Sequence, residues 1–482
     1  MKKEPIFRNG LMSESALLKS INRHFSIYIY AFALISYGII LFQAVNESLF
    51  PMPTAGTDQL SMLKTAVGIY KGHWPQEPYL YSSSYTLFLT FLVFLSQGNP
   101  LVMRFLQAAL CALIPVMIYR TGGKIGLSRE ASQLSALIYC FYGAAALISL
   151  DFLREAPLAL CFVMFAYCLV SAVLSRKNIF YIAAGVFAGL TVLGRETFIP
   201  IVTMGPLAFL FFKNIRGRVE IRQIIYCSTV FCGVLLPILL YNHIRFDSFS
   251  LAPGHVKNVL GAYHGNAASE NLTLAIFSIL KNIPSQIFKF ASSYEIPNSL
   301  SFYAHREMIP VLWIFVVPFN LMFGLALLGV YYYRRNKGVL FVAILSLLYM
   351  LSMIFVEMFY RFRISAIPLI SVLAGAGLYA VIHDKIRRRQ IFLTALLTCF
   401  FLFTYADPEK LRLPHEKIAV AEALIYNGRY EKAQNYLEKM ERDSIKCDLQ
   451  WIKLIAKLEK NQQQERANDV RMRFNEIVKQ RK

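Results

Sequence analysis

Long apolar runs separated by short polar connections dominate the hydrophobic pattern of the chain. Several runs are about 18–22 residues long, the length that a helix needs to cross about 30 Å of hydrocarbon. The runs lie at about 26–47, 100–119, 132–150, 156–174, 179–193, 197–212, 223–241, 309–332, 339–356, 364–382 and 391–405. The pattern therefore predicts an all-α polytopic membrane protein with about eleven transmembrane helices.

The segment between the first two runs has a different pattern. Residues 57–72 mix polar and apolar positions, as expected for a short helix at the membrane interface, and "GHWPQEP" ends it. The next stretch, "YSSSYTLFLTFLVFLSQGNP", holds only about 13 apolar residues, which is short for a span. We therefore expect an interfacial or re-entrant piece at 84–97 rather than a further crossing.

The basic residues orient these spans. They gather at the N-terminus and in alternate connections, namely "YRTGGKIGLSRE", "SRKN", "KNIRGRVEIR", "YRRNK" and "HDKIRRR". Because cytoplasmic loops are enriched in Lys and Arg, we expect a cytoplasmic N-terminus and an extracytoplasmic C-terminus in the cell (inner, cytoplasmic) membrane. A full span at 84–97 would move every later basic loop to the opposite side.

Composition supports the membrane assignment. Hydrophobic residues make up 56% of the 482 residues, and the mean hydropathy is +0.46. The net charge of +21 is spread over the loops without a nucleic-acid-binding motif, so orientation explains it and we expect no nucleic-acid partner. All cysteines except Cys447 lie in apolar runs, which favours small buried hydrophobes over a disulfide framework.

The chain changes character at about residue 406, which predicts a membrane domain over 1–405 and an extracytoplasmic tail over 406–482. The segment "AEALIYNGRYEKAQNYLEKMERD" has the pattern of one tetratricopeptide repeat, and a degenerate helix pair follows it. One or two repeats bury little core alone. The tail either packs on the membrane domain or on another envelope protein, or it is a solvated helical tail.

Ionisable residues collect at the predicted outer ends of the spans. They are Asp58, Glu77, Asp151, Arg154, Glu155, Arg195, Glu196, Glu357, Arg361 and Arg363. Such groups cost about 2.5–3.5 kcal/mol at membrane depth, so they face a shared cavity or else each caps a helix end in water. Carboxylates beside arginines suit a reaction in which an acid–base group activates a hydroxyl while cations hold a departing phosphate.

Three segments carry a resemblance to a known group. The stretches "DQLSMLKTAVGIYKGHWP", "YLYSSSYTLFLTFLVFLSQG" and "SLDFLREAPLALCF" resemble the GT-C integral-membrane glycosyltransferases. The similar branch contains the protein O-mannosyltransferases and the aminoarabinose transferases of lipid A, and the likeness in layout covers about residues 25–400. It implies inverting transfer of a hexosyl or pentosyl group from a polyprenyl-phosphate donor to a hydroxyl of a lipid, glycan or protein on the extracytoplasmic face.

The resemblance also implies roles for the acids. The family's base in the first outer loop, or a residue close to it, falls on Asp58. Many members have a second acid beside it, where this chain has Gln59. The acid of the second outer loop falls on Asp151 or on Glu155, and the motif fits both.

The implied phosphate-binding residues are basic. In "LGRETF", Arg195 matches a position that contacts the lipid phosphate in relatives, with Glu196 as a residue that holds it in place. In "EMFYRFRISAIPLI", Arg361 or Arg363 is expected near the donor phosphate. Further supporting candidates are Glu357, Arg154, Lys64 and Tyr85, although a water-facing helix explains Lys64 equally well and an aromatic belt explains Tyr85.

Three other interpretations of the sequence differ from this one. The outer histidines, His73, His243, His255, His264 and His305, fit no compact ligand spacing, so no cofactor is certain, and a divalent cation stays open without being indicated. A polysaccharide polymerase or ligase would share the long outer loop and the arginines without needing an acid in the first loop. A glycolipid flippase or transporter would place charges at mid-depth in repeat-related broken helices.

Overall fold

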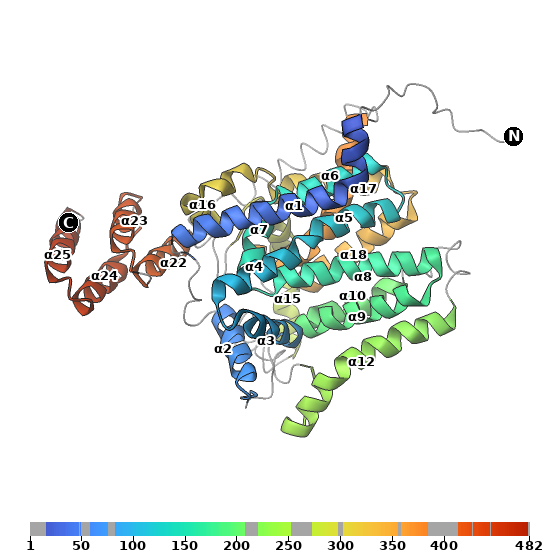
Figure 1. Ribbon diagram of the computed structural model, residues 1–482, viewed down its shortest axis with the longest axis horizontal. Coiled ribbons are helices and arrows are strands. Elements are labelled where there is room, and N and C mark those ends of the chain that lie inside the picture. The colour runs from blue at the N-terminus through green and yellow to red at the C-terminus, as the bar shows by residue number, and fades with distance from the viewer. Residues whose placement is uncertain are drawn as a thin grey trace.

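The computed structural model describes the greater part of the chain. The described residues are 16–47, 49, 58–75, 82–207, 220–251, 272–296, 302–354, 358–383, 413–426, 428–443 and 445–480. Helix is the only regular secondary structure within these ranges, which confirms the predicted all-α class (Figure 1).

The helices follow the predicted apolar runs closely. The first half contains α1 (Ala16–Asn46), α2 (Asp58–Tyr70), α3 (Ser83–Ser96), α4 (Pro100–Cys111), α5 (Leu113–Lys124), α6 (Arg129–Cys140), α7 (Gly143–Leu150), α8 (Glu155–Ser175) and α9 (Asn178–Gly194). The second half contains the 3₁₀ helix η1 (Glu196–Phe198), α10 (Ile199–Leu207), α12 (Ile221–Phe246), α15 (Leu272–Ala291), α16 (Phe302–Met308), the 3₁₀ helix η3 (Pro310–Ile314), α17 (Phe319–Tyr332), α18 (Lys337–Ile354), α19 (Tyr360–Arg363), the 3₁₀ helix η4 (Ile364–Ala366) and α20 (Ile367–His383).

Within the described residues, six helical segments are long and apolar enough to cross a membrane. They are His24–Asn46, Pro100–Lys124, Glu155–Ser175, Ile221–Phe246, Pro310–Tyr332 and Tyr360–His383. The pair α6 and α7 adds a seventh if its 60° bend lies within one span, and three shorter apolar helices accompany them. The chain is thus a multi-pass membrane protein. The total of eleven spans stays a prediction, because the run at 391–405 lies outside the described residues.

Capping residues explain where several helices begin. The side chain of Asn99 accepts hydrogen bonds from the backbone N–H groups of Leu101 and Val102, and Pro100 occupies the first position of α4. The side chain of Ser128 accepts from the N–H of Ala131 at the start of α6. These caps fix the first residues of α4 and α6.

The outer segments hold one predicted helix and one that the sequence interpretation missed. The interfacial helix expected at 57–72 is α2, and it packs on α3. The long outer loop expected at 242–308 contains α15, a 20-residue helix. Its lysines, Lys281 and Lys289, interrupt the apolar pattern, so it does not read as a span.

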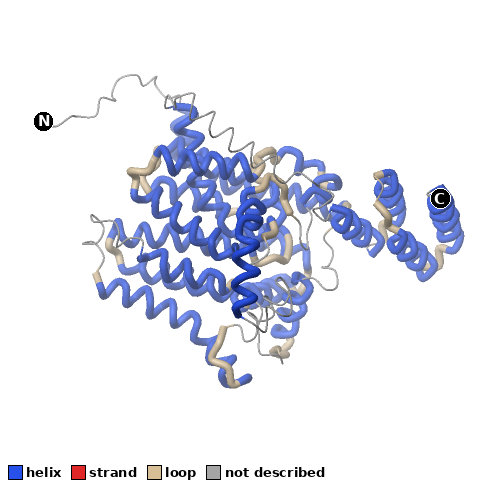
Figure 2. The backbone as a smooth tube through the Cα atoms, turned by 180° about the vertical axis from the view of Figure 1, so that it is seen from behind, coloured by secondary structure: helices blue, strands red, loops and turns tan. Residues whose placement is uncertain are grey.

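Helices α8 and α20 form the centre of the bundle. In the most apolar stretch of the Tyr360–His383 segment 83% of the residues are buried, against 11% in α12. Helix α20 packs on α6 and α17, and α8 packs on α5 and α9, with α12 outside α9. Figure 2 shows the same layered arrangement from behind. The outer ends of α8 and α20 therefore meet near the middle of one end of the bundle.

Two glycines allow α17 and α20 to pack closely. A Cβ atom at Gly377 would lie 1.9 Å from the carbonyl oxygen of Leu325, and one at Gly329 would lie 2.1 Å from that of Leu373. Small residues at helix crossings let backbones approach in membrane proteins. The α17–α20 contact thus depends on the missing side chains.

We expect Gly377→Ala to lower the thermal unfolding midpoint of the detergent-solubilised protein. The added methyl group has to push the two backbones apart, at a cost of about 1–3 kcal/mol. Gly233→Ala on α12 is the matched control, because a Cβ there meets nothing within 4 Å. Equal midpoints for the two variants would contradict the packing argument.

The tail consists of α22 (Leu413–Tyr426), α23 (Tyr430–Arg442), α24 (Asp448–Lys460) and α25 (Gln464–Gln480), which confirms a helical tail. Trp451 is fully buried and stacks on Phe474. Figure 1 shows these helices beside the end of the bundle where α1 ends. Lys432 Nζ lies 2.6 Å from Oε2 of Glu47, just after α1. The predicted boundary at 405 lies outside the described residues.

Candidate active site

Four charged side chains from distant segments meet at one end of the bundle. Asp58 opens α2, Glu155 opens α8, Arg195 lies between α9 and η1, and Arg361 lies in α19. Nη2 of Arg361 lies 2.6 Å from Oδ2 of Asp58, and Nε of Arg361 lies 4.0 Å from Oε1 of Glu155. Nη1 of Arg195 approaches the same Glu155 oxygen at 3.9 Å. We call these four residues the ion-pair cluster.

The inner part of the cluster is deeply buried. The side chain of Glu155 is 1% exposed and that of Arg195 is 5% exposed, whereas Asp58 keeps 37% of its side chain exposed. Both guanidinium groups lie over the ring of Phe362, Arg195 at 4.0 Å and Arg361 at 5.0 Å from its centre. The cluster is therefore open to solvent on the Asp58 side and closed behind Glu155.

Three buried polar atoms in the cluster have no hydrogen-bond partner among the described residues. They are Oε2 of Glu155, Nη1 of Arg195 and Nε of Arg361, whose Nη2 does bind Asp58. Buried polar atoms are normally satisfied, and leaving one without a partner costs about 1–3 kcal/mol. The arrangement favours a polar ligand that supplies the missing contacts.

The cations of the cluster set the protonation state of Asp58. Burial raises the pKa of Asp58, but the charge and hydrogen bond of Arg361, followed by the charges of Arg154 and Arg195, outweigh burial and bring the pKa below its usual value. Asp58 is therefore a carboxylate at neutral pH, able to accept a hydrogen bond or a proton.

Arg195 is held in place by close packing between α8 and α9. The carbonyl of Gly194 accepts hydrogen bonds from Nη1 of Arg154 at 3.1 Å and from Oγ of Ser82 at 3.0 Å. A Cβ atom on Gly194 would lie 2.2 Å from Cδ2 of Leu158, so any side chain there would require Leu158 to shift. The sequence Gly194–Arg195 thus ends α9 against α8 and turns the guanidinium toward Glu155.

Asp151, the other candidate for the second acid, belongs to a neighbouring network. Its Oδ1 accepts from Nη1 of Arg104 at 3.0 Å and from the N–H of Phe152 at 2.8 Å. Its Oδ2 accepts from Nε2 of Gln59 at 3.0 Å. Both oxygens are thus occupied by the protein, and the network fixes the first turn of α2, which carries Asp58.

Arg363 also lies apart from the cluster. Its Nη2 is 2.6 Å from Oε2 of Glu295, and its Nη1 donates to the carbonyls of Phe290 at 2.8 Å and Ser292 at 2.7 Å. The guanidinium lies 4.2 Å from the ring centre of Phe319. Arg363 therefore joins α19 to the segment that follows α15.

The supporting candidates occupy varied positions. Tyr85 is buried and donates a hydrogen bond to Oε1 of Gln107 at 2.8 Å. Glu196 opens η1 and is half-buried, and Lys64 is exposed on α2. Glu357 and Glu77 lie outside the described residues.

Sequence reasoning missed two charged residues that hold the site together. Arg104 lies in the apolar run of α4, where a lone ionisable residue is itself a signal of a buried partner. Glu295 lies in the long outer loop, whose pattern gives no indication of burial. Each is the acid–base partner of a residue that the sequence did single out.

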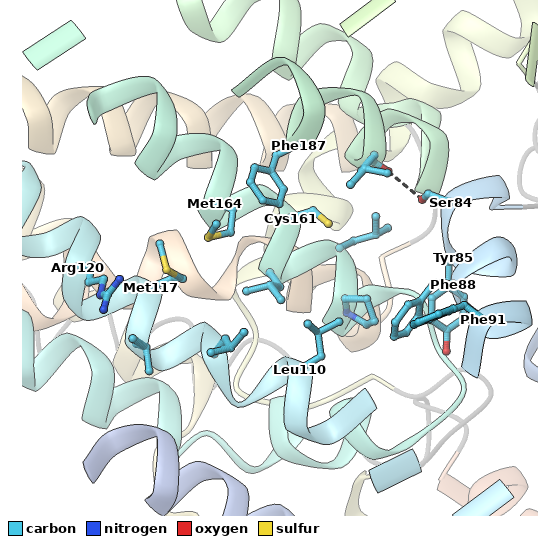
Figure 3. Close-up of a pocket in the computed structure, with 16 residues that line it drawn as sticks. Ser84, Tyr85, Phe88, Phe91, Leu110, Met117, Arg120, Cys161, Met164 and Phe187 are labelled. Carbon is cyan, nitrogen blue, oxygen red and sulfur yellow. Dashed lines mark hydrogen bonds between the residues drawn. The ribbon is translucent and has the colours of Figure 1, made fainter. Parts of the chain in front are cut away.

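An apolar cavity of about 610 Å³ lies among α3, α4, α5, α8 and α9. Figure 3 shows Tyr85, Phe88 and Phe91 toward one end and Met117 and Arg120 toward the other. Its wall includes Pro157, two residues beyond Glu155 on α8. The cavity therefore runs from the neighbourhood of the ion-pair cluster along the length of the bundle.

Metal ligands do not gather in the part of the chain that the structure describes. No three His, Cys, Asp or Glu side chains within those ranges converge on one point. The described residues therefore add nothing to the sequence-based expectation about a divalent cation.

The solved structures that are similar to this chain include two from Archaeoglobus fulgidus. The first is a crystal structure of its oligosaccharyltransferase in the apo form, with 13% identity and a TM-score of 0.47, covering 83% of this chain and 56% of that one. The second is the archaeal oligosaccharyltransferase AglB in complex with an inhibitory peptide and a dolichol-phosphate, with 14% identity, a TM-score of 0.46 and coverage of 86% and 60%. The chain thus spans less than two thirds of either.

The sequence comparison gives a clearer relation. No curated protein sequence matches the chain. Residues 82–242 match the family model described as dolichyl-phosphate-mannose-protein mannosyltransferase. This segment contains Glu155 and Arg195, while Asp58 and Arg361 lie outside it. The resemblance predicted from the motifs is confirmed: over residues 82–242 the chain is similar to the dolichyl-phosphate-mannose-protein mannosyltransferases, which are GT-C glycosyltransferases.

Proposed function

We propose that the protein transfers a sugar, with inversion, from a polyprenyl-phosphate donor to a hydroxyl acceptor on the extracytoplasmic face of the cell membrane. One observation carries the proposal. The ion-pair cluster joins a partly exposed, ionised carboxylate to two buried guanidinium groups, next to an apolar cavity of about 610 Å³.

The donor would lie with its chain in the cavity and its phosphate at Arg195 and Arg361. Arginine forms paired hydrogen bonds with phosphate oxygens. Nη1 of Arg195 lacks a hydrogen-bond partner within the described ranges, so it is available for such a bond. Glu155 keeps both arginines in position, and its charge is offset by theirs.

The acceptor would approach from the exposed side of the cluster, beside Asp58. The acceptor oxygen attacks the anomeric carbon from the face opposite the phosphate, and its proton passes to the Asp58 carboxylate. The bond between the anomeric carbon and the phosphate oxygen breaks, and the electron pair leaves with the phosphate. Arg195 and Arg361 stabilise the charge that develops there.

This proposal assigns roles among the alternatives that the motifs left open. Glu155 is the second acid of the site, and Asp151 is a positioning residue that holds α2 through Gln59. Arg361 faces the donor phosphate, and Arg363 anchors the outer loop. The domain division at 405, the orientation and the tail as a docking element for an envelope protein remain part of the proposal.

The test is a transfer assay with the purified chain in liposomes. A polyprenyl-phosphate monosaccharide is supplied, and release of polyprenyl phosphate together with a glycosylated acceptor is the expected result. Consumption of a lipid-linked oligosaccharide alone would instead establish a polymerase or ligase. Movement of the glycolipid between leaflets without consumption would establish a flippase.

The pH dependence of transfer tests the link between Arg361 and Asp58. Because Arg361 lowers the pKa of Asp58, Arg361→Gln raises it, so protonation begins at a higher pH. The acidic limb of the kcat profile should therefore move to higher pH in this variant, on top of a lower plateau. Lys64→Gln, an exposed change on the same helix, should leave the limb in place. An unmoved limb in Arg361→Gln would separate Asp58 from proton transfer.

Filling the apolar cavity tests the donor assignment. We expect Cys161→Trp to raise KM for a long-chain donor about tenfold, equivalent to about 1.4 kcal/mol, because the indole occupies the space of the lipid chain. Cys232→Trp on the exposed side of α12 is the control. Steady-state kinetics with long-chain and short-chain donors check this, and an equal KM for both variants would place the lipid elsewhere.

A further inference from the structure

A second cavity, of about 240 Å³, lies among α7, α16, η3 and the segment after α15. Five aromatic side chains line it, namely Tyr142, Phe302, Tyr303, Trp313 and Phe315. The charged residues that line it are Glu295 and Arg306. None of these elements carries a member of the ion-pair cluster, so the cavity is a separate feature of the molecule. We call it the aromatic pocket.

Arg306 is enclosed by rings. Its guanidinium carbon lies 4.1 Å from the ring centre of Trp313, 5.1 Å from that of Tyr303 and 5.5 Å from that of Phe302. Ring faces attract a cation without neutralising it. Within the described part of the chain, Arg306 has ring contacts and no ion pair with an acid. Its N–H groups are thus available for an anion.

Glu295 does not neutralise Arg306. Its Oε2 pairs with Arg363 at 2.6 Å, and its Oε1 accepts a hydrogen bond from the hydroxyl of Tyr142 at 2.9 Å. Its backbone N–H donates to the hydroxyl of Tyr303. Both carboxylate oxygens of Glu295 are thus engaged by other residues. Among the described lining residues, Arg306 is the charged group that has no counter-charge.

The pocket is placed where lipid reaches it. Trp313 is 59% exposed and Val316 is 72% exposed, and both lie in the Pro310–Tyr332 segment that is apolar enough to span a membrane. Large apolar side chains exposed on such a segment face lipid. Figure 1 places α16 and α7 near the end of α1 that α22 approaches, at the end of the bundle and not at its mid-depth. An arginine there is costly unless it serves a ligand or reaches the headgroups.

We propose that the aromatic pocket is a binding site for the phosphate group of an anionic membrane lipid, with Arg306 as the anion-binding residue. The lipid enters from the bilayer past Trp313 and Val316, and its acyl chains stay outside the pocket. Arginine suits this task because its planar group binds phosphate oxygens through paired N–H groups while its face stacks on a ring. No member of the ion-pair cluster lines this pocket.

Native mass spectrometry of the full chain in nanodiscs tests this. Wild type is compared in phosphatidylcholine alone and with a minor fraction of phosphatidylglycerol. We expect retained phosphatidylglycerol, with an affinity that falls tenfold or more in Arg306→Gln, because charge-assisted hydrogen bonds are lost. Arg334→Gln is the matched control, since Arg334 also stacks on a tyrosine, Tyr331, but lies outside the pocket. Equal retention by Arg306→Gln and wild type overturns the proposal.

Two further arms secure the interpretation. Arg306→Lys keeps the cation but loses the paired N–H groups, so we expect an affinity between those of wild type and Arg306→Gln. Loss equal to that of Arg306→Gln, with an unchanged unfolding midpoint, would show that the positive charge does not hold the lipid, which overturns the proposal. Inorganic phosphate, added to nanodiscs with and without phosphatidylglycerol, distinguishes the source of the anion. Weak or no competition by phosphate supports a lipid headgroup, whereas binding of phosphate without retention of the lipid overturns the lipid assignment.

Discussion

Asp58→Asn is expected to lower kcat for sugar transfer by about 10²–10⁴, the usual contribution of a positioned general base. The amide is nearly the same size as the carboxylate but cannot take the proton of the acceptor hydroxyl. Asparagine is also favourable at the start of a helix, so α2 should remain intact. Turnover of a polyprenyl-phosphate sugar in liposomes measures the effect.

Lys64→Gln is the matched control for Asp58→Asn. Lys64→Gln alters one charge on the same helix at an exposed position and should retain full turnover. The unfolding midpoint of Asp58→Asn should stay near that of wild type, because Asp58 is partly exposed and its loss leaves Arg361 beside Glu155. Normal turnover in a folded Asp58→Asn protein would remove this residue from the chemistry.

Arg363→Gln should give the largest loss of stability. The change leaves the buried Glu295 carboxylate without its cation, and breaking a buried pair in this way costs about 3–5 kcal/mol. The carbonyls of Phe290 and Ser292 lose their donor as well. The thermal unfolding midpoint in detergent should fall far more than it does for Arg361→Gln.

A double variant distinguishes pairing from packing. Arg363→Met combined with Glu295→Leu removes both charges and should be less destabilised than Arg363→Gln, since neither charge is then buried alone. If Arg363→Gln instead kept its midpoint and lost transfer, Arg363 rather than Arg361 would be the ligand of the donor phosphate.

The convergence of the site could be predicted from the sequence because it follows from topology alone. Once the basic loops fix the sides of the membrane, the outer ends of α8, α9 and α20 lie on one face, and Glu155, Arg195 and Arg361 lie at those ends. The order of the spans restricts these residues to one small region whatever their side chains do. The order of the spans and the charges of the loops were enough to predict that these residues lie near one another.

The choice between neighbouring candidates could not be made in this way. Arg361 and Arg363 are two positions apart in one short helical turn, so their side chains point about 200° apart around its axis. Which of them faces Asp58 depends on Glu295, about 68 positions away in the chain. Asp151 and Glu155 differ for the same reason, because Arg104 and Gln59 engage only the first of them.

The number of spans was the other limit. Hydropathy measures length and composition, and by these measures Asn178–Gly194, which we predicted to cross, and Ser83–Ser96, which we predicted to be interfacial or re-entrant, are both short apolar helices. The apolar run at 132–150 likewise does not predict the 60° bend between α6 and α7. Packing against neighbouring helices decides these cases, and the sequence of one segment does not specify which helices it contacts.

The single helical turn that carries both arginines couples two distant parts of the protein. Displacing the segment around Glu295 would rotate α19 and swing Arg361 away from its carboxylate. Thermodynamic reciprocity then applies: a molecule that binds more tightly when Arg361 is seated must tighten the loop by an equal free energy. Ligand binding at the ion-pair cluster and ordering of the outer loop would therefore increase or decrease together, without a hinge between them.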